Sequence, residues 1–476
     1  MKFIILALIL LSAAVWLVPA FLENPAFIIA VLGAGILMII SITNFETGLL
    51  LLLLVIPLAS QANLGAAGGA PVDFGTDDFF IFCLFLVWLV YLGKTKQAPF
   101  VENPLTWPFL SYLAACLISF IPMIAIRTTQ PVLSLLHLVK WYEYVFIYFV
   151  LVKCLETRDQ IERFAALAVG SSVLIAVMDA GEIVMGTPAK WATASFESNG
   201  ILGAFYLFFM NIAISFLVEM KGARLRAVLA ASIALLTFGL FNTGARAAYL
   251  GAVVSVIVLG LLHRKQWLFL AILAMLAVPA LWNKVVTEEI SKTFTMDAAK
   301  FRQDRYQDVG SYRLNMLSGR YRPGTTLQLD VSSAERFIQW KKARNQIYRN
   351  PIIGTGYWSG RFIGVFRFTT AHSFYLTLLI ETGAIGFLAF MWLAWSLLYH
   401  SWVFSRRTLD PFYSALAKGF ASGFTGILVH CFFGETFEAF RLTGPLWMTA
   451  GILFAAKRLD ESGRGTGLPE EPAFEA

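Results

Sequence analysis

The chain has 476 residues, of which 58% are hydrophobic and only 14% are charged. Soluble globular proteins carry about 25% charged residues, and apolar runs as long as those found here do not stay in water. The mean hydropathy of +0.70 points the same way. These values exclude a string of soluble domains and predict an all-α, polytopic integral membrane protein.

Apolar runs long enough to cross a bilayer recur along the chain. A hydrocarbon core of about 30 Å needs roughly 20 apolar residues in a helix. We predict about 14 transmembrane helices, with a range of 12 to 14 because the second, third and last runs are short or poorly separated. The runs lie at residues 3–21, 27–42, 45–61, 78–93, 105–126, 132–152, 163–184, 199–219, 224–242, 246–262, 266–283, 372–398, 412–432 and 441–456.

These runs divide the chain into four regions. Residues 1–283 hold predicted transmembrane helices 1 to 11, and residues 284–371 form one large loop. Residues 372–458 hold helices 12 to 14. Residues 459–476 are rich in Gly, Pro and Glu, a composition typical of a solvated, disordered tail.

The basic residues of the short loops predict the orientation, because short cytoplasmic loops collect Lys and Arg. With 14 spans, every basic cluster falls on the same side. Both termini are therefore predicted to be cytoplasmic, and the large loop periplasmic. The clusters are Lys2, Lys94 with Lys96, Lys153 with Arg158, Lys221 with Arg224 and Arg226, Arg264 with Lys265, Arg406 with Arg407, and Lys457 with Arg458.

The large loop holds the whole positive surplus of the chain. Residues 284–371 contain 15 Lys and Arg against 7 Asp and Glu, a net +8, whereas the full chain has a net charge of +7. At 88 residues the loop exceeds the roughly 60 residues over which the positive-inside rule is counted. Its cations therefore point to a function outside the membrane.

An amphipathic helix is predicted in this loop at about residues 333–350. Ser332 and Glu335 have the spacing of a capping box, and Pro351 ends the helix. Such helices tend to lie along the membrane interface. Four apolar residues share roughly one side, Phe337, Trp340, Ile347 and Tyr348, and five cations flank them, Arg336, Lys341, Lys342, Arg344 and Arg349.

Two cations and one histidine are candidates for chemistry. His372 stands at the mouth of a predicted span directly after the basic loop, and Arg246 lies in a very short turn between two spans. Arginine binds phosphate oxygens through a planar fork of donors. Histidine titrates near neutral pH and suits the activation of a hydroxyl. Together they predict handling of a lipid-linked pyrophosphate, whereas His137 and His430 are predicted to be hydrogen-bonded packing residues.

Ionisable residues also fall inside the predicted spans. Lys140 and Glu143 are one helical turn apart and are predicted to form an intramembrane ion pair. Asp77 and Asp78 precede the fourth span and are predicted to cap its helix. No metal-ligand, nucleotide-binding or nucleic-acid motif is recognisable, and the four cysteines lack the spacing of a zinc site. No metal, cofactor or nucleic-acid partner is predicted.

Several short motifs in a fixed order resemble the shared region of the O-antigen ligase and O-antigen polymerase (Wzy-type) family of membrane glycosyltransferases. The strongest part covers residues 335–386. Thr243–Arg246 resembles the short arginine motif of that family, and Ser198–Leu202 is a weaker match. The motifs in the strong part are Glu335–Trp340, Asn350–Gly356, Ala371–Leu376 and Glu381–Gly386.

The resemblance implies an all-helical, GT-C-like glycosyltransferase that is metal-independent and uses an undecaprenyl-pyrophosphate-linked glycan as donor. By position, Arg246 and Arg336 would bind the pyrophosphate, and His372 would orient or deprotonate the acceptor hydroxyl. A single in-line displacement would invert the anomeric configuration. Residues that could support the site are Lys140, Glu143, Trp340 and Glu381.

The implied setting is the inner membrane of a bacterium, with a periplasmic active site used in O-antigen, exopolysaccharide or capsule synthesis. The expected partners are the lipid-linked donor, a glycan or lipid-core acceptor, membrane lipids and other polysaccharide assembly proteins. Polymerase and ligase stay open, although the lack of a ligase-specific feature favours a polymerase. A secondary transporter or lipid-linked glycan flippase is the alternative that the Lys140 and Glu143 pair favours, and a noncatalytic scaffold is a third.

Overall fold

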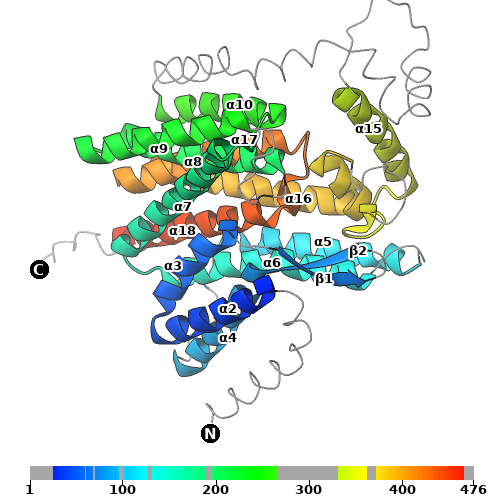
Figure 1. The fold of residues 1–476 in the computed structure, drawn as a ribbon, viewed down its shortest axis with the longest axis horizontal. Helices are drawn as coiled ribbons and strands as arrows, with labels where there is room; N and C mark the ends of the chain where they lie inside the picture. Colours follow the sequence, from blue (N-terminus) through cyan, green and yellow to red (C-terminus); the bar gives the residue numbers. More distant parts are fainter. Residues whose placement is uncertain are drawn as a thin grey trace, which may run out of the picture.

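The protein, seen in a computed structural model, is a bundle of long helices that run roughly side by side, with one β-hairpin (Figure 1). The structure describes residues 25–58, 61–67, 70–95, 101, 103–125, 131–187, 196, 198–264, 331–361 and 371–465. The longer helices in this part of the chain are α2 (Pro25–Thr43), α4 (Thr76–Thr95), α5 (Thr106–Ala125), α6 (Pro131–Cys154), α7 (Arg158–Val184), α8 (Asn199–Glu219), α9 (Ala223–Asn242), α10 (Arg246–His263), α15 (Val331–Arg349), α16 (Phe374–Arg407), α17 (Pro411–His430) and α18 (Phe440–Gly465).

Local signals in the sequence set where several of these helices begin. Thr157 starts α7 through a capping box with Gln160. The Ser198 side chain accepts a hydrogen bond at the start of α8. Asp410 caps α17, and Pro411 occupies its first helical position, where the missing N–H costs nothing.

Seven described helices are long and apolar enough to cross a membrane, as a polytopic membrane protein requires. The predicted spans at residues 3–21 and 266–283 lie outside the described residues, so a total of 14 spans stays a prediction. The seven are Thr106–Ile124, Pro131–Cys154, Arg158–Val184, Asn199–Glu219, Ala223–Asn242, Arg246–His263 and Phe374–Arg407.

The third predicted span, at residues 45–61, is wrong. This stretch forms α3 (Phe45–Val55), which has only 11 residues, and a 3-10 turn at Ile56–Leu58. At about 1.5 Å per residue such a helix is too short to cross a bilayer. Pro57 lies in the turn and lacks the N–H that a longer helix would need.

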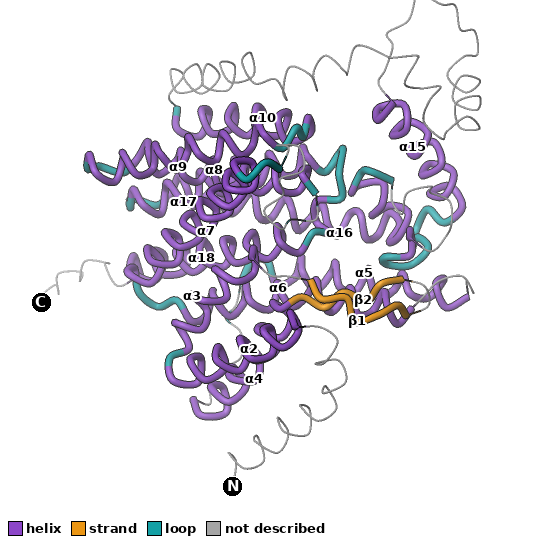
Figure 2. Tube along the Cα trace, viewed as in Figure 1, coloured by secondary structure: helices purple, strands orange, loops and turns teal. Residues whose placement is uncertain are grey.

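A hairpin follows this turn and departs from the all-α prediction. Strand β1 (Gln61–Ala67) pairs antiparallel with β2 (Ala70–Gly75), and Figure 2 shows the two strands in orange among the helices. The tail predicted from residue 459 also differs, because α18 continues to Gly465. The described bundle is otherwise helical, as the apolar runs predicted.

Helix α17 packs closely against both α8 and α10. Glycines on α17 make this approach possible, because a Cβ at Gly423 would stand 2.8 Å from the Phe208 carbonyl oxygen of α8. A Cβ at Gly426 would come within 2.9 Å of the Gly251 carbonyl oxygen of α10. Small residues at such crossings let helix backbones touch within a membrane protein.

The two ends of the bundle carry different charged groups. At the end that we call the basic end, Arg158 pairs with Asp410, and Arg458 donates a hydrogen bond of 2.8 Å to the Leu155 carbonyl. Glu219 lies at this end too and accepts from Lys418 at 2.7 Å. These contacts gather the predicted basic clusters near residues 153–158, 406–410 and 457–458, and the starts of α8, α10 and α16 lie at the other end.

Candidate active site

Two glycine-containing segments that stood out in the sequence pack directly against each other. Gly383 has a φ of +64° and interrupts the helical geometry of α16, and Gly354, just after α15, has a φ of +72°. Four backbone hydrogen bonds of 2.8 to 3.2 Å join residues 351–356 to residues 380–385. A Cβ on either glycine would collide with the facing backbone. We call this pairing the glycine clamp.

The Glu381 carboxylate extends the glycine clamp to the next residues of the loop. It accepts hydrogen bonds from the backbone N–H of Trp358 at 2.9 Å and of Gly360 at 3.1 Å. The Tyr357 N–H donates to Ser119 Oγ of α5 at 2.9 Å. Glu381 is buried, so these donors supply the hydrogen bonds that a carboxylate loses when it leaves water. Its observed contacts are those of a residue that orders the loop.

Helix α15 docks on the start of α16 through a small residue. Ala343 is fully buried and packs with Ala371 and Ile380. Trp340 lies one turn earlier on α15, and its ring centroid is 6.4 Å from that of Phe433 in the turn after α17. Arg336 lies one further turn along the same side of α15 and therefore approaches the same turn.

The apolar face predicted for this helix is partly wrong. Gln339, Ala343 and Gln346 are the buried positions, whereas Tyr348 is 73% exposed. The helix begins at Val331, one residue before the Ser332 that was expected to cap it, and ends at Arg349 as Pro351 predicted. Contact with α16 selects its inner face, because the small Ala343 allows a closer approach than a ring would.

His372 precedes the first turn of α16 in a strained backbone conformation. Its φ is +51°, a region that non-glycine residues seldom adopt. The Phe374 N–H, two residues on, donates to the carbonyls of Cys431 at 2.9 Å and Gly434 at 3.1 Å. His372 is therefore held next to the turn that follows α17, which is the turn that Trp340 contacts.

His430, the last residue of α17, lies at the centre of these elements. It is 3% exposed, and its Nδ1 is 2.7 Å from Thr436 Oγ1. Its ring also packs against the first turn of α8, because a Cβ at Gly200 would stand 3.7 Å from Nε2, and the charge of Arg336 acts on it. The expectation that His430 is a hydrogen-bonded residue is confirmed, but its neighbours are those of the predicted site.

Arg246 occupies the first position of α10, beside the start of α8. A Cβ at Gly203 of α8 would stand 3.2 Å from Thr243 Oγ1 and 3.4 Å from the Ala245 Cβ. Since Gly200 contacts His430, the starts of α8 and α10 and the end of α17 lie together. The N-terminus of a helix carries a partial positive charge, so α8 and α10 add to the field of the arginine.

The predicted core of the site is thus carried by elements that meet at one end of the bundle. Arg246 begins α10, Arg336 lies on α15, and His372 precedes α16. All three elements meet around the turn at residues 431–436, opposite to the basic end. Among the described residues no group of His, Cys, Asp and Glu has the arrangement of a metal site. The roles of the three residues stay predictions.

The predicted ion pair between Lys140 and Glu143 does not form. The Lys140 Nζ pairs instead with Asp78 Oδ2 of α4 at 2.9 Å and lies 4.6 Å from the centre of the Phe440 ring. One carboxylate oxygen of Glu143, Oε2, is buried without a hydrogen-bond partner in the described structure. The Lys140 and Glu143 pair that favoured a transporter is therefore absent, and Lys140 instead joins α6 to α4.

Asp77 and Asp78 are also placed differently from the prediction. Both lie inside the first turn of α4, where they are buried, rather than before it as caps. Asp77 accepts a hydrogen bond from the Tyr144 hydroxyl of α6, and Asp78 pairs with Lys140. The two carboxylates join α4 to α6, which their position before an apolar run did not reveal.

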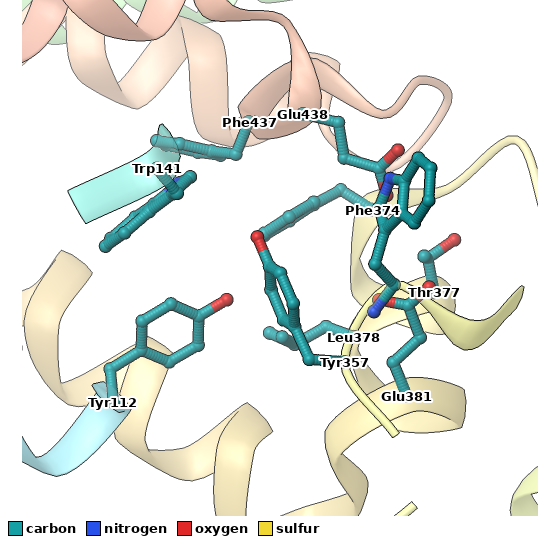
Figure 3. Close-up of a pocket in the computed structure, with 10 residues that line it drawn as sticks. Tyr112, Trp141, Tyr357, Phe374, Thr377, Leu378, Glu381, Phe437 and Glu438 are labelled. Carbon is teal, nitrogen blue, oxygen red and sulfur yellow. The ribbon is translucent and has the colours of Figure 1, made fainter. Parts of the chain in front are cut away.

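A small hollow lies next to the start of α16. Aromatic rings form most of its wall, and Figure 3 shows the hydroxyls of Tyr112 and Tyr357 pointing toward its interior. Burial raises the pKa of Tyr357 well above its ordinary value, so this hydroxyl remains a neutral donor. Phe374, Thr377 and Glu381 of α16 complete the wall nearest His372.

The fold and this site define a helical membrane protein with cations gathered at one end. Residues 231–391 match the family model described as O-antigen ligase. The resemblance noted in the sequence is confirmed by this match. Five of the residues predicted for the site fall inside the matched region, Arg246, Arg336, Trp340, His372 and Glu381.

No curated protein matches the chain in sequence. The family match gives the protein a glycosyltransferase-like role at a membrane, in polysaccharide assembly. Lys140, Glu143 and His430 lie outside the matched residues. Sequence reasoning missed the part that His430 plays in the site, because its contacts join elements that are distant in the chain.

Proposed function

We propose that the protein transfers a glycan from an undecaprenyl-pyrophosphate carrier to a sugar hydroxyl, on the periplasmic side of a bacterial inner membrane. The observation that carries this proposal is the meeting of the elements that bear Arg246, Arg336 and His372 around the turn at residues 431–436, within or beside an O-antigen ligase domain. Both termini would be cytoplasmic, and the architecture would be GT-C-like. Other polysaccharide assembly proteins would be partners.

The arginines would act on the leaving group. When the bond between the anomeric carbon and the pyrophosphate breaks, negative charge gathers on the pyrophosphate. Donors that are already in place stabilise such charge without reorganising, and the loss of one costs roughly 3 to 4 kcal/mol, or about 100- to 1,000-fold in rate. Arg246 at the start of α10 adds its charge to that of the helix N-terminus, a common site for phosphate groups.

His372 would act on the acceptor. Its strained backbone fixes the direction in which the imidazole leaves the chain. A histidine near the acceptor hydroxyl could take its proton as the new bond forms. Attack from the face opposite the pyrophosphate would invert the anomeric centre.

Product formation by the purified protein tests this proposal. The assay supplies a defined undecaprenyl-pyrophosphate glycan with either a second glycan or a lipid core as acceptor, in the presence of a chelator, and products are identified by mass. We expect Arg246→Ala, Arg336→Ala and His372→Ala each to lower the rate by about 100-fold or more. Extension of the glycan would identify a polymerase, and transfer to the lipid core a ligase.

Arg344→Ala is the matched control, because Arg344 is an exposed arginine on the same helix α15. We expect this variant to keep close to full activity. All variants should elute and melt like the unchanged protein, which separates catalysis from folding. Full activity in Arg336→Ala or His372→Ala would remove the role proposed for that residue. Movement of the donor across the bilayer without a new glycosidic bond would favour the flippase alternative.

A further inference from the structure

His430 lies between two parts of the chain that meet near Arg336. Nδ1 lies 2.7 Å from Thr436 Oγ1, which belongs to the turn after α17. The other side of the ring packs against Gly200 at the start of α8. A Cβ at Gly200 would stand 3.7 Å from Nε2, so Nε2 is the nitrogen that faces α8. One side chain thus ties α17, α8 and the 431–436 turn together.

The slot around this ring is shaped for it. A Cβ at Gly434 would come within 3.0 Å of the His430 Cε1, closer than ordinary contacts allow. The ring is almost completely buried, and a buried polar group costs free energy unless its hydrogen bonds are made. An apolar side chain would fill the same space without that requirement. A fully bonded imidazole instead gives the slot one defined geometry.

The slot adjoins the elements that carry the proposed pyrophosphate ligands. The charge of Arg336 acts on His430 directly. The turn that Thr436 belongs to also receives the Phe374 N–H, two residues after His372, and packs against Trp340. The start of α8, which His430 binds, lies against the start of α10 at Arg246. The elements that bear Arg246, Arg336 and His372 therefore each lie next to the start of α8 or the 431–436 turn, the two parts between which His430 lies.

We propose that His430 is a positioning residue that sets the geometry of the pyrophosphate site by tying the start of α8 to the 431–436 turn beneath Arg336. This inference rests on the proposed function, since it assumes that the cations bind a pyrophosphate. It concerns a residue outside the matched region 231–391. His430 acts on the anion through the placement of Arg246 and Arg336.

The affinity of the purified full chain for inorganic pyrophosphate tests the proposal, measured by calorimetric titration in detergent. His430→Phe keeps the ring volume but removes the hydrogen bond to Thr436, and we expect pyrophosphate to bind roughly tenfold more weakly, equivalent to about 1.4 kcal/mol. His430→Gln keeps a side chain that can hydrogen-bond Thr436 and should recover most of the affinity. With the lipid-linked donor, the KM of His430→Phe should rise more than its kcat falls.

His263→Phe is the matched control. His263 is also a buried histidine with two polar partners, Ser215 Oγ at 3.0 Å and Glu219 Oε1 at 3.1 Å, but it lies at the basic end of the same group of helices. Replacement of a histidine whose role is purely structural should lower the melting temperature and leave the affinity for pyrophosphate unchanged. We expect this result for His263→Phe. Thr436→Val removes the hydroxyl that lies next to His430 Nδ1 and replaces His430→Phe in the test if that variant does not fold. We expect its affinity for pyrophosphate to fall by about threefold.

The outcomes separate this inference from the proposed function. Unchanged pyrophosphate affinity in His430→Phe and Thr436→Val, combined with lost affinity in Arg336→Ala, would overturn the role of His430 and leave the proposed function intact. If pyrophosphate binds neither the unchanged protein nor Arg336→Ala, both proposals fail. Weaker binding in His430→Phe that His430→Gln restores, with an unaffected His263→Phe, supports the positioning role.

Discussion

At the scale of single residues, the site depends on backbone conformations that side chains rarely adopt. His372 and Trp358 have φ values of +51° and +59°, and Gly354 and Gly383 also have positive φ. Each strained non-glycine residue costs about 1 to 3 kcal/mol, which surrounding contacts must offset. The glycine clamp and the Glu381 carboxylate provide those contacts around Trp358, and the two bonds of the Phe374 N–H provide them next to His372. The backbone conformation at His372 therefore depends on contacts made by its neighbours in the chain.

We predict that Gly383→Ala destabilises the protein by roughly 2 kcal/mol or more, because the new Cβ meets the Ile352 carbonyl in a backbone conformation that alanine avoids. Thermal unfolding in detergent measures the loss, and glycosyl transfer should fall with it. Gly181→Ala in α7 is the control, since a Cβ there meets nothing within 4 Å. Equal melting temperatures for the two variants would contradict the role of the glycine clamp.

A buried ion pair gives a second prediction at this scale. In Lys140→Met the Asp78 carboxylate loses its cation in a site where both side chains are nearly buried, and removal of one partner from such a pair typically costs about 3 to 5 kcal/mol. The double variant Lys140→Met with Asp78→Asn should be more stable than Lys140→Met alone. Thermal unfolding of the single and double variants provides the comparison.

Lys457→Met is the control for this pair, because Lys457 contacts Glu461, whose side chain is 56% exposed. Ion pairs open to water contribute little to stability, about 0 to 1 kcal/mol. Its melting temperature should therefore stay close to that of the unchanged protein. A Lys140→Met variant as stable as Lys457→Met would show that Asp78 does not depend on Lys140.

At the scale of elements, α15 is positioned by a small contact with α16. Ala343 is its central buried residue, and the glycine clamp holds the chain just beyond its end. Arg336 reaches the 431–436 turn only while α15 keeps this position. The position of Arg336, a predicted pyrophosphate ligand, therefore depends on how the methyl group of Ala343 packs against Ala371 and Ile380.

We expect Ala343→Trp to displace α15 from α16, because an indole cannot fit where a methyl group is fully buried. Glycosyl transfer should fall by about tenfold or more while the helical content seen by circular dichroism stays the same. Tyr348→Ala on the exposed side of the same helix should retain activity. An Ala343→Trp variant with normal activity would show that docking of α15 is not required.

At the scale of the whole molecule, two separate groups of basic residues lie at opposite ends of the bundle. The basic end joins Arg158, Asp410 and Arg458, whereas the elements that bear Arg246, Arg336 and His372 meet at the other end. Short loops rich in Lys and Arg stay in the cytoplasm. The site would then face the opposite compartment, where a lipid-linked glycan that has crossed the membrane is used.

Cysteine labelling in spheroplasts tests this orientation. A membrane-impermeant maleimide should modify Arg344→Cys in intact spheroplasts and Glu461→Cys only after permeabilisation, because both positions are exposed at opposite ends. Cys116 and Cys431 are buried, whereas Cys83 and Cys154 are partly exposed, so both labelling variants are made in a protein that also carries Cys83→Ser and Cys154→Ser. Labelling of Arg344→Cys only after permeabilisation would place the site in the cytoplasm and overturn the proposed function.

The sequence by itself determined the membrane class, most of the helices and the family motifs. Hydropathy is a local property, so the apolar runs at residues 163–184 and 412–432 were enough to locate α7 and α17, although α7 begins earlier, at Arg158. The order of the motifs around Arg336 and His372 could likewise be read along the sequence. The prediction from the sequence failed at residues 45–61. The apolar run suggested one long helix there, whereas the helix ends in the turn at Pro57 and a hairpin follows.

Only the tertiary structure decided which of these residues meet. Lys140 lies one turn from Glu143, yet it pairs with Asp78, because the packing of α4 on α6 brings that carboxylate to 2.9 Å. His430 is joined to Gly200 by the antiparallel packing of α8 and α17. Such pairings depend on how helices cross and on where a glycine lets backbones approach. Periodicity along one helix carries no information on either, so the contacts of the site could not be read from the chain alone.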